Sequence, residues 1–490
     1  MQNEKMRWYD PITINFYWFA LSLRSNVLTP LLLPLLVQRF VGEAAKGASY
    51  GNLRLYSLMV ALVVQAMMGL LSDRSTSRLG RRRPFILGGT LLDVGLLLLI
   101  GLIGSTMSGQ QGYNTLFIVV VLSGISINIA HAATQGLIPD LVPEQQRGRY
   151  SGIKALFEVP LPLIVTPFLI APMIRAGNYM AAIFTLIGVM LAAALITMFV
   201  RERQQKEAPF PMDWSALGRL ALMTLVFTGI IIALGQGVKL LVPLFTKGSG
   251  SLVLLGLIGL AAMLAAILGG VTASVKLGLG QEAKAHPSFT WWVINRLAFM
   301  VGAVNLSGFV LYFIQERFPE LQGDAAAGPT SQLMMMVGLA LLVSSLPSGW
   351  LSDRLGTKRL LLISGILAVI GGVIVLMAPS IRIMMLGGIV VGLGIGSFYS
   401  ANWALGTRLV PKDQAGRYLG LSNLAGAGAG AIGGYIGGPI GDQAGFTVLM
   451  VIYASLFLIS TLALSKIDLP WGPSRANPPA AEELGHEPNA

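Results

Sequence analysis

Cysteine is absent from this sequence of 490 residues, and charged residues are scarce. Without cysteine, the chain can form no disulfide bond, no reactive thiol and no metal site built on sulfur. Asp, Glu, Lys and Arg make up only 11% of the chain, whereas a soluble domain of average composition carries about 25%. The three histidines (His131, His286 and His486) lack the spacing of metal ligands, and we find no phosphate-binding loop. We therefore expect no metal, no cofactor and no enzymatic activity.

Hydrophobic residues make up 54% of the chain, and the mean hydropathy is +0.71. Fourteen apolar stretches are long enough to cross a hydrocarbon core of about 30 Å. The net charge of +12 could indicate a nucleic-acid partner. However, the basic residues lie in short loops, mostly on one side of the spans, which is the positive-inside pattern. We expect a multi-pass protein of the plasma or inner cell membrane, in contact with lipid, with both termini in the cytoplasm and no nucleic-acid partner.

The apolar stretches predict an all-α membrane protein of two six-helix halves, with two extra central helices between them. A polar stretch after residue 200 separates the first six spans from the rest. The tail is rich in Pro, Ala and Glu, a composition typical of disorder. The predicted parts are a first half (1–200), a cytoplasmic linker (201–216), an inserted helix pair with its loop (217–289), a second half (290–466) and a disordered tail (467–490).

A charged loop motif occurs twice, each time between two apolar stretches. The first copy starts at Gly69 and contains Asp73, and the second starts at Gly349 and contains Asp353, 280 residues after Asp73. A second motif, Gly-Arg-Tyr, follows in both halves in the same order. Two charged motifs in one order indicate a duplicated bundle, with chance similarity of apolar sequence as the weaker alternative. Related halves around a central path are common in secondary transporters.

The charged loop resembles the signature motif of the major facilitator superfamily, which lies between the second and third helices of each half. The resemblance implies the major facilitator fold and a loop that latches one half against the other in one conformation. A carboxylate at a helix end can pair with arginine or cap a facing helix N-terminus. Arg81, Arg82 and Arg83 could instead serve only as topology anchors and lipid contacts. The resemblance assigns the latch to Gly69, Asp73, Arg74, Gly80, Arg81, Arg149, Gly349, Asp353, Arg354, Gly356, Arg359 and Arg417.

The first copy of the loop is longer than the second, and this extended form resembles that of plant sucrose–proton symporters, which are near the glycoside–pentoside–hexuronide symporters. This resemblance implies a sugar as cargo and coupling to protons. Two features depart from it, because Gln135 stands near the place of an arginine in those symporters, and they have twelve helices. The inserted pair is similar to 14-span drug–proton antiporters, but residues 155–173 contain no glycine and so lack the antiporter glycine–proline signature.

A Gly-x-Gly-x-x-Gly match at residues 428–433 does not indicate nucleotide binding, because it follows no strand and lies inside an apolar span. Glycine at every fourth position predicts close helix packing in the membrane instead. The glycines concerned are Gly426, Gly430, Gly434 and Gly438.

Polar side chains inside apolar spans are costly and therefore indicate function. On the fourth span, Asn128, His131 and Gln135 share one face at helical spacing. The family resemblance places the first and fourth helices of each half along the cavity, so we expect their polar faces to bind the solute. The alternative for each residue is a hydrogen bond between helices of one half. The predicted solute-binding residues are Asn15, Trp18, Ser22, Asn128, His131, Gln135, Asn295, Asn305, Tyr399, Asn402 and Trp403.

Charged residues within the spans are few, and Glu158 is the predicted proton-coupling group. It lies about 15 Å into the fifth span, near the middle of the membrane. A carboxylate that meets a cation in only one conformation would bind and release a proton in each cycle. Lys154 and Arg24 are the candidate cations, and Asp93 is the second candidate carboxylate. A permanent ion pair is the alternative, and Lys239 of the inserted pair is expected to snorkel outward.

We predict a secondary transporter that moves a small polar solute, preferably a sugar, by alternating access with proton symport. The predicted oligomeric state is a monomer. Drug or metabolite efflux by antiport is the first alternative. A receptor or assembly factor with a transporter fold is an alternative of another class, but a static protein would not need the latch motif in both halves.

Overall fold

The structure is a computed structural model that describes residues 6–202, 214–245, 251–280, 282–285, 287–410 and 415–469. Within this part of the chain the secondary structure is helical, and thirteen helices are long and apolar enough to cross a membrane. A further long helix, α18 (Ala415–Ala444), brings the number of long helices to the fourteen spans that the sequence predicts. The all-α, multi-pass prediction is therefore confirmed.

Prolines interrupt the first and fifth spans. A proline has no N–H to donate, so helical hydrogen bonding is rearranged around it. The first span changes to π-helix at η1, which contains Pro30, and the fifth breaks before Pro160 and changes to π-helix at η3. The helices of the first six spans are α1 (Asp10–Val27), η1 (Leu28–Leu32), α2 (Leu33–Val41), η2 (Glu43–Ala45), α3 (Lys46–Asp73), α4 (Arg83–Thr106), α5 (Gly109–Gln135), α6 (Leu137–Leu141), α7 (Glu144–Glu158), α8 (Pro160–Val165), η3 (Thr166–Ile170), α9 (Ala171–Arg175) and α10 (Tyr179–Met198).

The remaining spans begin with α11 and α12, which pack on each other and on α18. α11 also packs against α3, so the extra helices touch both groups of six spans. The predicted domain boundaries remain predictions. The helices are α11 (Trp214–Leu241), η4 (Val242–Phe245), α12 (Ser251–Leu279), α13 (Glu282–Ala285), α14 (Pro287–Arg317), η5 (Gly323–Ala326), α15 (Ala327–Leu355), α16 (Thr357–Met377), α17 (Ile381–Leu409), α18, α19 (Phe446–Ala463) and η7 (Leu464–Lys466).

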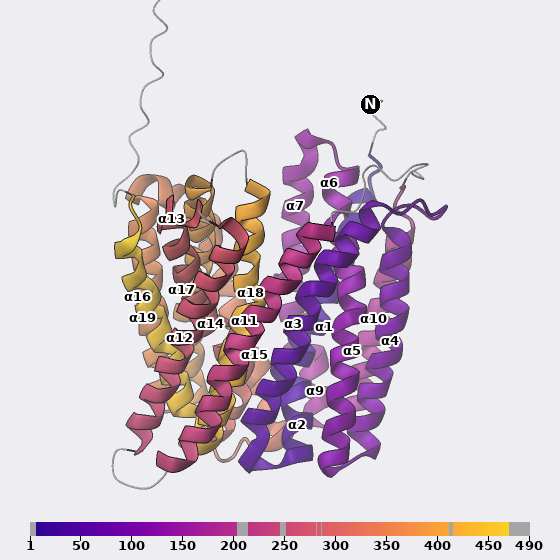
Figure 1. Ribbon diagram of the computed structural model, residues 1–490. Coiled ribbons are helices and arrows are strands. Elements are labelled where there is room, and N and C mark those ends of the chain that lie inside the picture. Colours follow the sequence, from indigo (N-terminus) through magenta and orange to yellow (C-terminus); the bar gives the residue numbers. More distant parts are fainter. Residues whose placement is uncertain are drawn as a thin grey trace, which may run out of the picture.

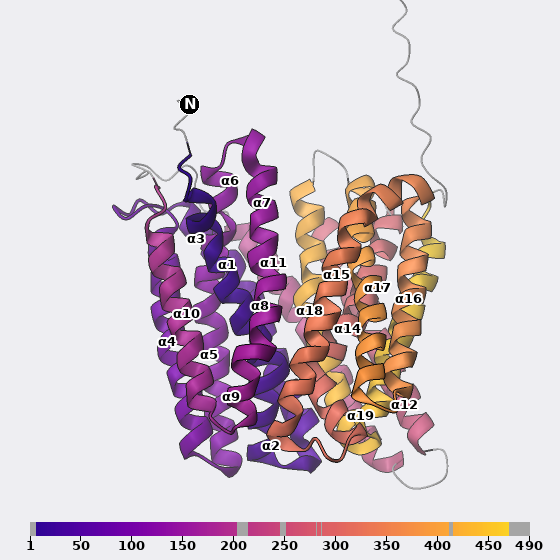
Figure 2. The ribbon, with the colours of Figure 1, turned by 180° about the vertical axis from the view of Figure 1, so that it is seen from behind.

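The first six spans lie beside the last six, and the two groups are closer at the lower end of Figures 1 and 2 than at the upper end. α3 packs along α18, and α15 packs against α8 and α9. The loop of residues 74–82 lies at the upper end, where α3 ends and α4 begins. We call the opposite end, where α3 begins, the outer end, following the predicted topology.

Glycines allow α3 and α18 to approach closely at the outer end. A Cβ at Gly51 would lie 2.1 Å from the carbonyl oxygen of Gly434, and one at Gly438 would lie 2.1 Å from that of Gly47. Any larger residue would force the two helices apart. The predicted packing role is confirmed for Gly434 and Gly438, whereas a Cβ at Gly426 would meet nothing within 4 Å.

Polar groups reinforce this outer contact between the halves. The Asp442 carboxylate of α18 accepts hydrogen bonds from the backbone N–H groups of Gly47 and Ala48, each at 2.7 Å. These N–H groups begin α3 and have no partner within their own helix. Tyr312 of α14 donates its hydroxyl to the carbonyl oxygen of Pro34 at 2.7 Å. The arrangement is therefore one in which the halves are joined at the outer end.

Candidate solute-binding site

Helices α1, α5 and α7 of the first half bring four polar or aromatic side chains together. The rings of Trp18 and His131 meet edge to face, with their centroids 5.4 Å apart. Lys154 Nζ lies 3.7 Å from the centroid of the Trp18 ring, which is a cation–π contact. It also lies 3.2 Å from Glu158 Oε2, as an ion pair between successive turns of α7. We call Trp18, His131, Lys154 and Glu158 the first-half cluster.

Two buried polar atoms of α1 lack a hydrogen-bond partner in the part of the chain that the structure describes. They are the indole Nε1 of Trp18 and the amide Oδ1 of Asn15. An unpaired buried donor or acceptor costs about 1–3 kcal/mol, so a bound solute that pairs with it would recover that free energy. The Trp18 indole Nε1 is thus a buried donor, next to His131, that lacks a partner among the described residues.

The other predicted residues of the first half differ in what they contact. Gln135 is exposed, and its Nε2 lies 3.3 Å from Nε2 of His131, which extends the first-half cluster along α5. Asn128 donates to the carbonyl oxygen of Gly124 within its own helix at 2.8 Å. Ser22 is half-buried on α1.

Glu158 lies at a break in the fifth span. It is the last residue of α7, and α8 starts at Pro160. The C-terminal end of a helix disfavours a carboxylate, and the ammonium of Lys154 one turn earlier offsets this. Interrupted helices at mid-membrane are common where transporters bind substrates and coupling ions. Glu158 thus lies beside the Lys154 ammonium at an interruption of the fifth span.

Arg24 and Asp93 form a network separate from the first-half cluster. Arg24 Nε lies 2.7 Å from Asp93 Oδ2, and Arg24 Nη2 lies 3.0 Å from Asp93 Oδ1. Ser123 and Ser126 also donate to Asp93, at 2.6 and 3.0 Å. Asp93 is fully buried, so it needs a partner cation of its own. Arg24 therefore turns to α4 and is not the cation beside Glu158 in this structure.

The second half has its own group of polar and aromatic residues on α14 and α17. Arg296 Nη1 donates to Asn402 Oδ1 at 3.1 Å, and the Arg296 guanidinium carbon lies 5.2 Å from the centroid of the Trp403 ring. Arg296 Nε is buried and lacks a partner among the described residues. Tyr399 lies one turn before Trp403 and is half-buried. We call Arg296, Tyr399, Asn402 and Trp403 the second-half cluster.

In the second half, the three asparagines that were predicted to face the solute are completely buried: Asn295, Asn305 and Asn402. Asn402 Nδ2 donates to Asn295 Oδ1 at 2.9 Å, and Asn295 donates to the carbonyl oxygen of Ser460 at 2.8 Å. Asn305 donates to the carbonyl oxygen of Ala429 at 2.8 Å. Their amides join helices in this arrangement because a buried amide must find partners.

The first copy of the charged loop forms its ion pairs within the first half. Asp73 pairs with Arg82 of the same loop, and Arg82 Nε lies 2.9 Å from Asp140 Oδ2 of α6. Arg81 also pairs with Asp140. The predicted target Arg149 is exposed at the start of α7. The carboxylate of Asp73 is thus held by its own loop in this conformation.

Glu202 closes the same loop from the end of the sixth span. Its carboxylate accepts from the backbone N–H of Arg82 at 2.9 Å. Burial raises the pKa of Glu202, and the hydrogen bonds from the Arg83 and Arg82 backbone oppose that rise. A Cβ at Gly80 would lie 2.4 Å from a Glu202 carboxylate oxygen, and Gly80 has φ +105°. Close approach and positive φ together require glycine at this motif position.

In the second copy of the loop, Gly356 has φ +90° and ends α15, which again requires glycine. Asp353 and Arg359 are exposed, and the Arg354 guanidinium carbon lies 4.1 Å from the centroid of the Trp350 ring. The side chain of the predicted target Arg417 lies outside the described residues. At Gly69 and Gly349, an added Cβ would meet nothing within 4 Å.

Sequence reasoning missed two charged residues that join the halves. Asp442 caps α3, as described above, and Arg54 is a buried cation of the second span. Arg54 Nη1 donates to Asn305 Oδ1 at 2.9 Å, and a Cβ at Gly308 would lie 1.9 Å from the same nitrogen. A lone arginine in an apolar stretch was the available signal for Arg54.

Comparison with known proteins agrees with this architecture. The profile of the Major Facilitator Superfamily matches residues 18–317 and 297–486. A nucleoside transporter of known structure superimposes with a TM-score of 0.65 at 11% identity, over 94% of this chain and 100% of that one. A peptide transporter superimposes with a TM-score of 0.63 at 15% identity, over 94% and 95%. At these identities the structures show a shared fold only.

Three curated relatives are transporters or permeases by name. Myo-inositol transporter 2 of Schizosaccharomyces pombe is 32% identical over 122 residues, which is 24% of this chain and 22% of that one. General alpha-glucoside permease of the same organism is 28% identical over 169 residues, 30% and 29% of the chains. The human proton-associated sugar transporter A is 30% identical over 146 residues, 28% and 18% of the chains. Each match spans less than a third of the relative. Because the superfamily profile covers most of the chain, the protein belongs to the Major Facilitator Superfamily, as the charged loops predicted.

Proposed function

We propose that this protein is a secondary transporter that carries a sugar or polyol together with protons across the cell membrane. Membership of the superfamily supports transport, and the names of the partial relatives support inositol- or glucoside-like cargo. The observation that carries the proposal is the pair of clusters. In each half a tryptophan ring contacts a cation, and one buried nitrogen of that contact lacks a partner among the described residues: Trp18 Nε1 in the first half and Arg296 Nε in the second.

The chemistry of the two clusters suits a polyhydroxylated ring. Binding sites for small molecules combine apolar or aromatic walls with a few placed polar groups. Trp18 and Trp403 supply aromatic faces for the C–H surface of such a ring. Trp18 Nε1 and Arg296 Nε supply donors for its hydroxyl oxygens. His131 and Gln135 would add hydrogen bonds on the first-half side.

Glu158 is the proposed site of the coupling proton. Lys154 is its partner in this conformation, at 3.2 Å. The Glu158 side chain is 36% exposed, and we infer that its exposed part faces the path of the solute, from which a proton can reach it. Loss of the Lys154 contact in another conformation would favour the protonated, neutral carboxyl, because a charge in a low-dielectric site is costly without a partner. Proton binding would then depend on the conformation, which is what coupling requires.

The charged loops are proposed to latch the halves at the cytoplasmic end when the outer end opens. A Cβ at Gly69 or Gly349 would meet nothing within 4 Å in this conformation. Glycine at these positions would let a helix of the opposite half pack closely when the cytoplasmic end closes. In the arrangement described here, Asp73 is held by Arg82 of its own loop. Closure would exchange such local partners for groups of the opposite half. Cytoplasmic termini and a monomeric state belong to the same proposal.

The test is uptake into proteoliposomes that contain the purified protein, with labelled myo-inositol, maltose and glucose and an imposed pH gradient. We expect at least one of these solutes to accumulate when the gradient is present. Trp18→Ala should raise the KM for that solute about tenfold, which corresponds to the loss of one contact of about 1.4 kcal/mol. Trp8→Ala is the matched control, because Trp8 is 85% exposed and lies outside the clusters.

Other outcomes would decide between the alternatives. If wild-type protein with native helical content accumulates none of these sugars or polyols, the proposed cargo is wrong. Outward movement of drug-like dyes driven by the pH gradient would favour an efflux antiporter. Tight sugar binding without exchange across the membrane would favour a receptor.

A further inference from the structure

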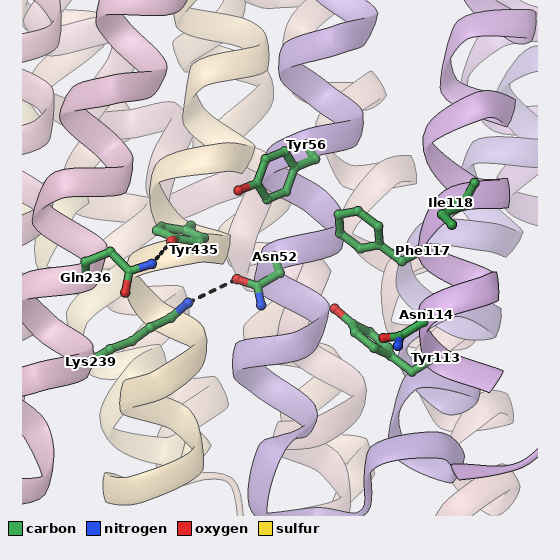
Figure 3. A pocket seen from close by; sticks show the side chains of 9 residues that line it. All are labelled: Asn52, Tyr56, Tyr113, Asn114, Phe117, Ile118, Gln236, Lys239 and Tyr435. Atoms are coloured by element: carbon green, nitrogen blue, oxygen red, sulfur yellow. Dashed lines mark hydrogen bonds between the residues drawn. The ribbon is translucent and has the colours of Figure 1, made fainter. Parts of the chain in front are cut away.

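A pocket lies at the outer end, and none of its lining residues belongs to either cluster. Its volume is about 430 Å³, and it opens between α11 and the two helices α3 and α5. Figure 3 shows Lys239 and Gln236 reaching into it from α11 on one side. The lining residues are Asn52, Tyr56, Tyr113, Asn114, Phe117, Ile118, Gln236, Lys239 and Tyr435.

The charge in this pocket comes from Lys239. Its ammonium donates to the amide oxygen of Asn52 at 3.1 Å and lies 4.3 Å from the centroid of the Tyr435 ring. Neither of these groups carries a negative charge, so neither neutralises the lysine. The sequence led us to expect that Lys239 would snorkel outward, but it turns into the pocket instead (Figure 3). Among the residues that the structure describes, this half-buried cation is held by neutral groups, which favours an anionic ligand.

The depth of the pocket matches the level of lipid headgroups. Asn52 lies six residues into α3, and Asn114 lies five residues into α5. At 1.5 Å per residue these positions are about 8–9 Å from the outer helix ends. Lys239 lies two residues before the end of α11. The pocket is therefore near the border between the hydrocarbon core and the polar headgroups.

Exposed apolar side chains on the same helices as the lining residues suit acyl chains. Ile118 is 59% exposed on α5, and Leu122 of the same face is also exposed. On α11 and η4, Leu240 and Leu244 are exposed as well. We expect exposed apolar side chains on membrane-spanning helices to face lipid, so the pocket would join a polar recess to an apolar surface.

We propose that this pocket binds the phosphate headgroup of an anionic phospholipid, with Lys239 as the principal contact. The amides of Asn52, Asn114 and Gln236 would donate hydrogen bonds to the headgroup oxygens. The acyl chains would lie along the exposed apolar side chains of α5 and α11.

The bound lipid would also favour the conformation described here. Asn52 belongs to α3 of the first half, whereas Tyr435 belongs to α18 of the second half. Gln236 of α11 donates to the Tyr435 hydroxyl at 2.9 Å, so α11 is tied to the second half at this point. Separation of α3 from α18 at the outer end would pull the walls apart. A ligand that needs both walls stabilises the joined state.

The binding test uses the delipidated full-length protein in detergent, titrated with phosphatidylglycerol and observed by native mass spectrometry. We expect one phosphatidylglycerol to bind more tightly than the others. Lys239→Gln should weaken it at least tenfold. Lys276→Gln removes an exposed lysine in the last turn of α12, at the end of the molecule opposite the pocket. This control variant should leave phosphatidylglycerol binding unchanged. Equal weakening by both variants, or none by Lys239→Gln, would overturn the proposal.

Two further arms identify the ligand and its effect. Phosphatidylcholine with the same acyl chains should bind at least tenfold less tightly, because its choline cation already compensates the phosphate. Full displacement of phosphatidylglycerol by an equal concentration of inorganic phosphate would overturn the lipid assignment. Spin labels at Gln111 and Glu320, both exposed at the outer end, report the distance between the halves. Phosphatidylglycerol should increase the fraction of molecules with the short distance of the joined state, and an unchanged distance distribution would refute the conformational effect.

Discussion

The carboxylate of Asp442 is expected to control how easily the two halves separate at the outer end. It accepts two backbone hydrogen bonds from the start of α3, both at 2.7 Å. Asp442 belongs to α18, so both bonds cross between the halves. They also place a negative charge at a helix N-terminus, where the helix dipole favours it. Asp442→Ala removes all of these interactions and leaves the N–H groups of Gly47 and Ala48 to find water.

The size of the effect follows from these contacts. A hydrogen bond to a charged group contributes roughly 1.5–3 kcal/mol when it stays intact. Once the halves separate, water forms hydrogen bonds with these N–H groups, so part of the free energy of the lost bonds is recovered in the separated state. We therefore expect a net loss of about 2 kcal/mol for the joined state, which shifts the conformational equilibrium about 30-fold. Asp442→Asn retains one carbonyl oxygen as an acceptor and should shift it less.

Pulsed electron paramagnetic resonance can measure this equilibrium. The chain contains no cysteine, so Gln111→Cys and Glu320→Cys can carry spin labels without a background. The Asp442→Ala variant should populate longer distances between these labels. Glu144→Ala is the control, because Glu144 is exposed at the start of α7, at the other end of the molecule. A distance distribution in Asp442→Ala that matches wild type would refute the reasoning.

Three further results are expected. Glu158→Gln should keep solute exchange but lose accumulation driven by a pH gradient, because the neutral amide mimics the protonated carboxyl. Accumulation at the wild-type level in vesicles would exclude Glu158 as the coupling site. His131→Ala should raise the Kd for the transported solute about tenfold, by removing one polar contact of about 1.4 kcal/mol, and unchanged affinity in equilibrium binding would assign His131 to packing with Trp18. Asp73→Asn should slow transport more than tenfold with less than a twofold change in solute Kd, because it acts on the balance of conformations; a normal transport rate would remove the latch role.

The sequence predicted the spans well because each one is a local property. Apolar length sets where a helix can cross the membrane, and α12 at Ser251–Leu279 lies within residues 217–289, where the sequence predicts the inserted helix pair. The motif glycines were also readable, since Gly80 and Gly356 lie where positive φ favours glycine. The same holds for Lys154 and Glu158, because residues four apart meet on any helix.

The partners of the remaining polar residues depended on the tertiary structure. Arg24 pairs with Asp93, 69 residues away, and not with Glu158, because helix packing alone decides which buried charge lies nearby. Asn295 and Asn402 lie 107 residues apart in the sequence, and Asn402 donates a hydrogen bond to Asn295 at 2.9 Å. Hydropathy and spacing identified these side chains as significant, since polar groups in a membrane need partners. Only the packing of α14 against α17, and of α1 against its neighbours, determined which partners they found, because a hydrogen bond requires contact within about 3 Å.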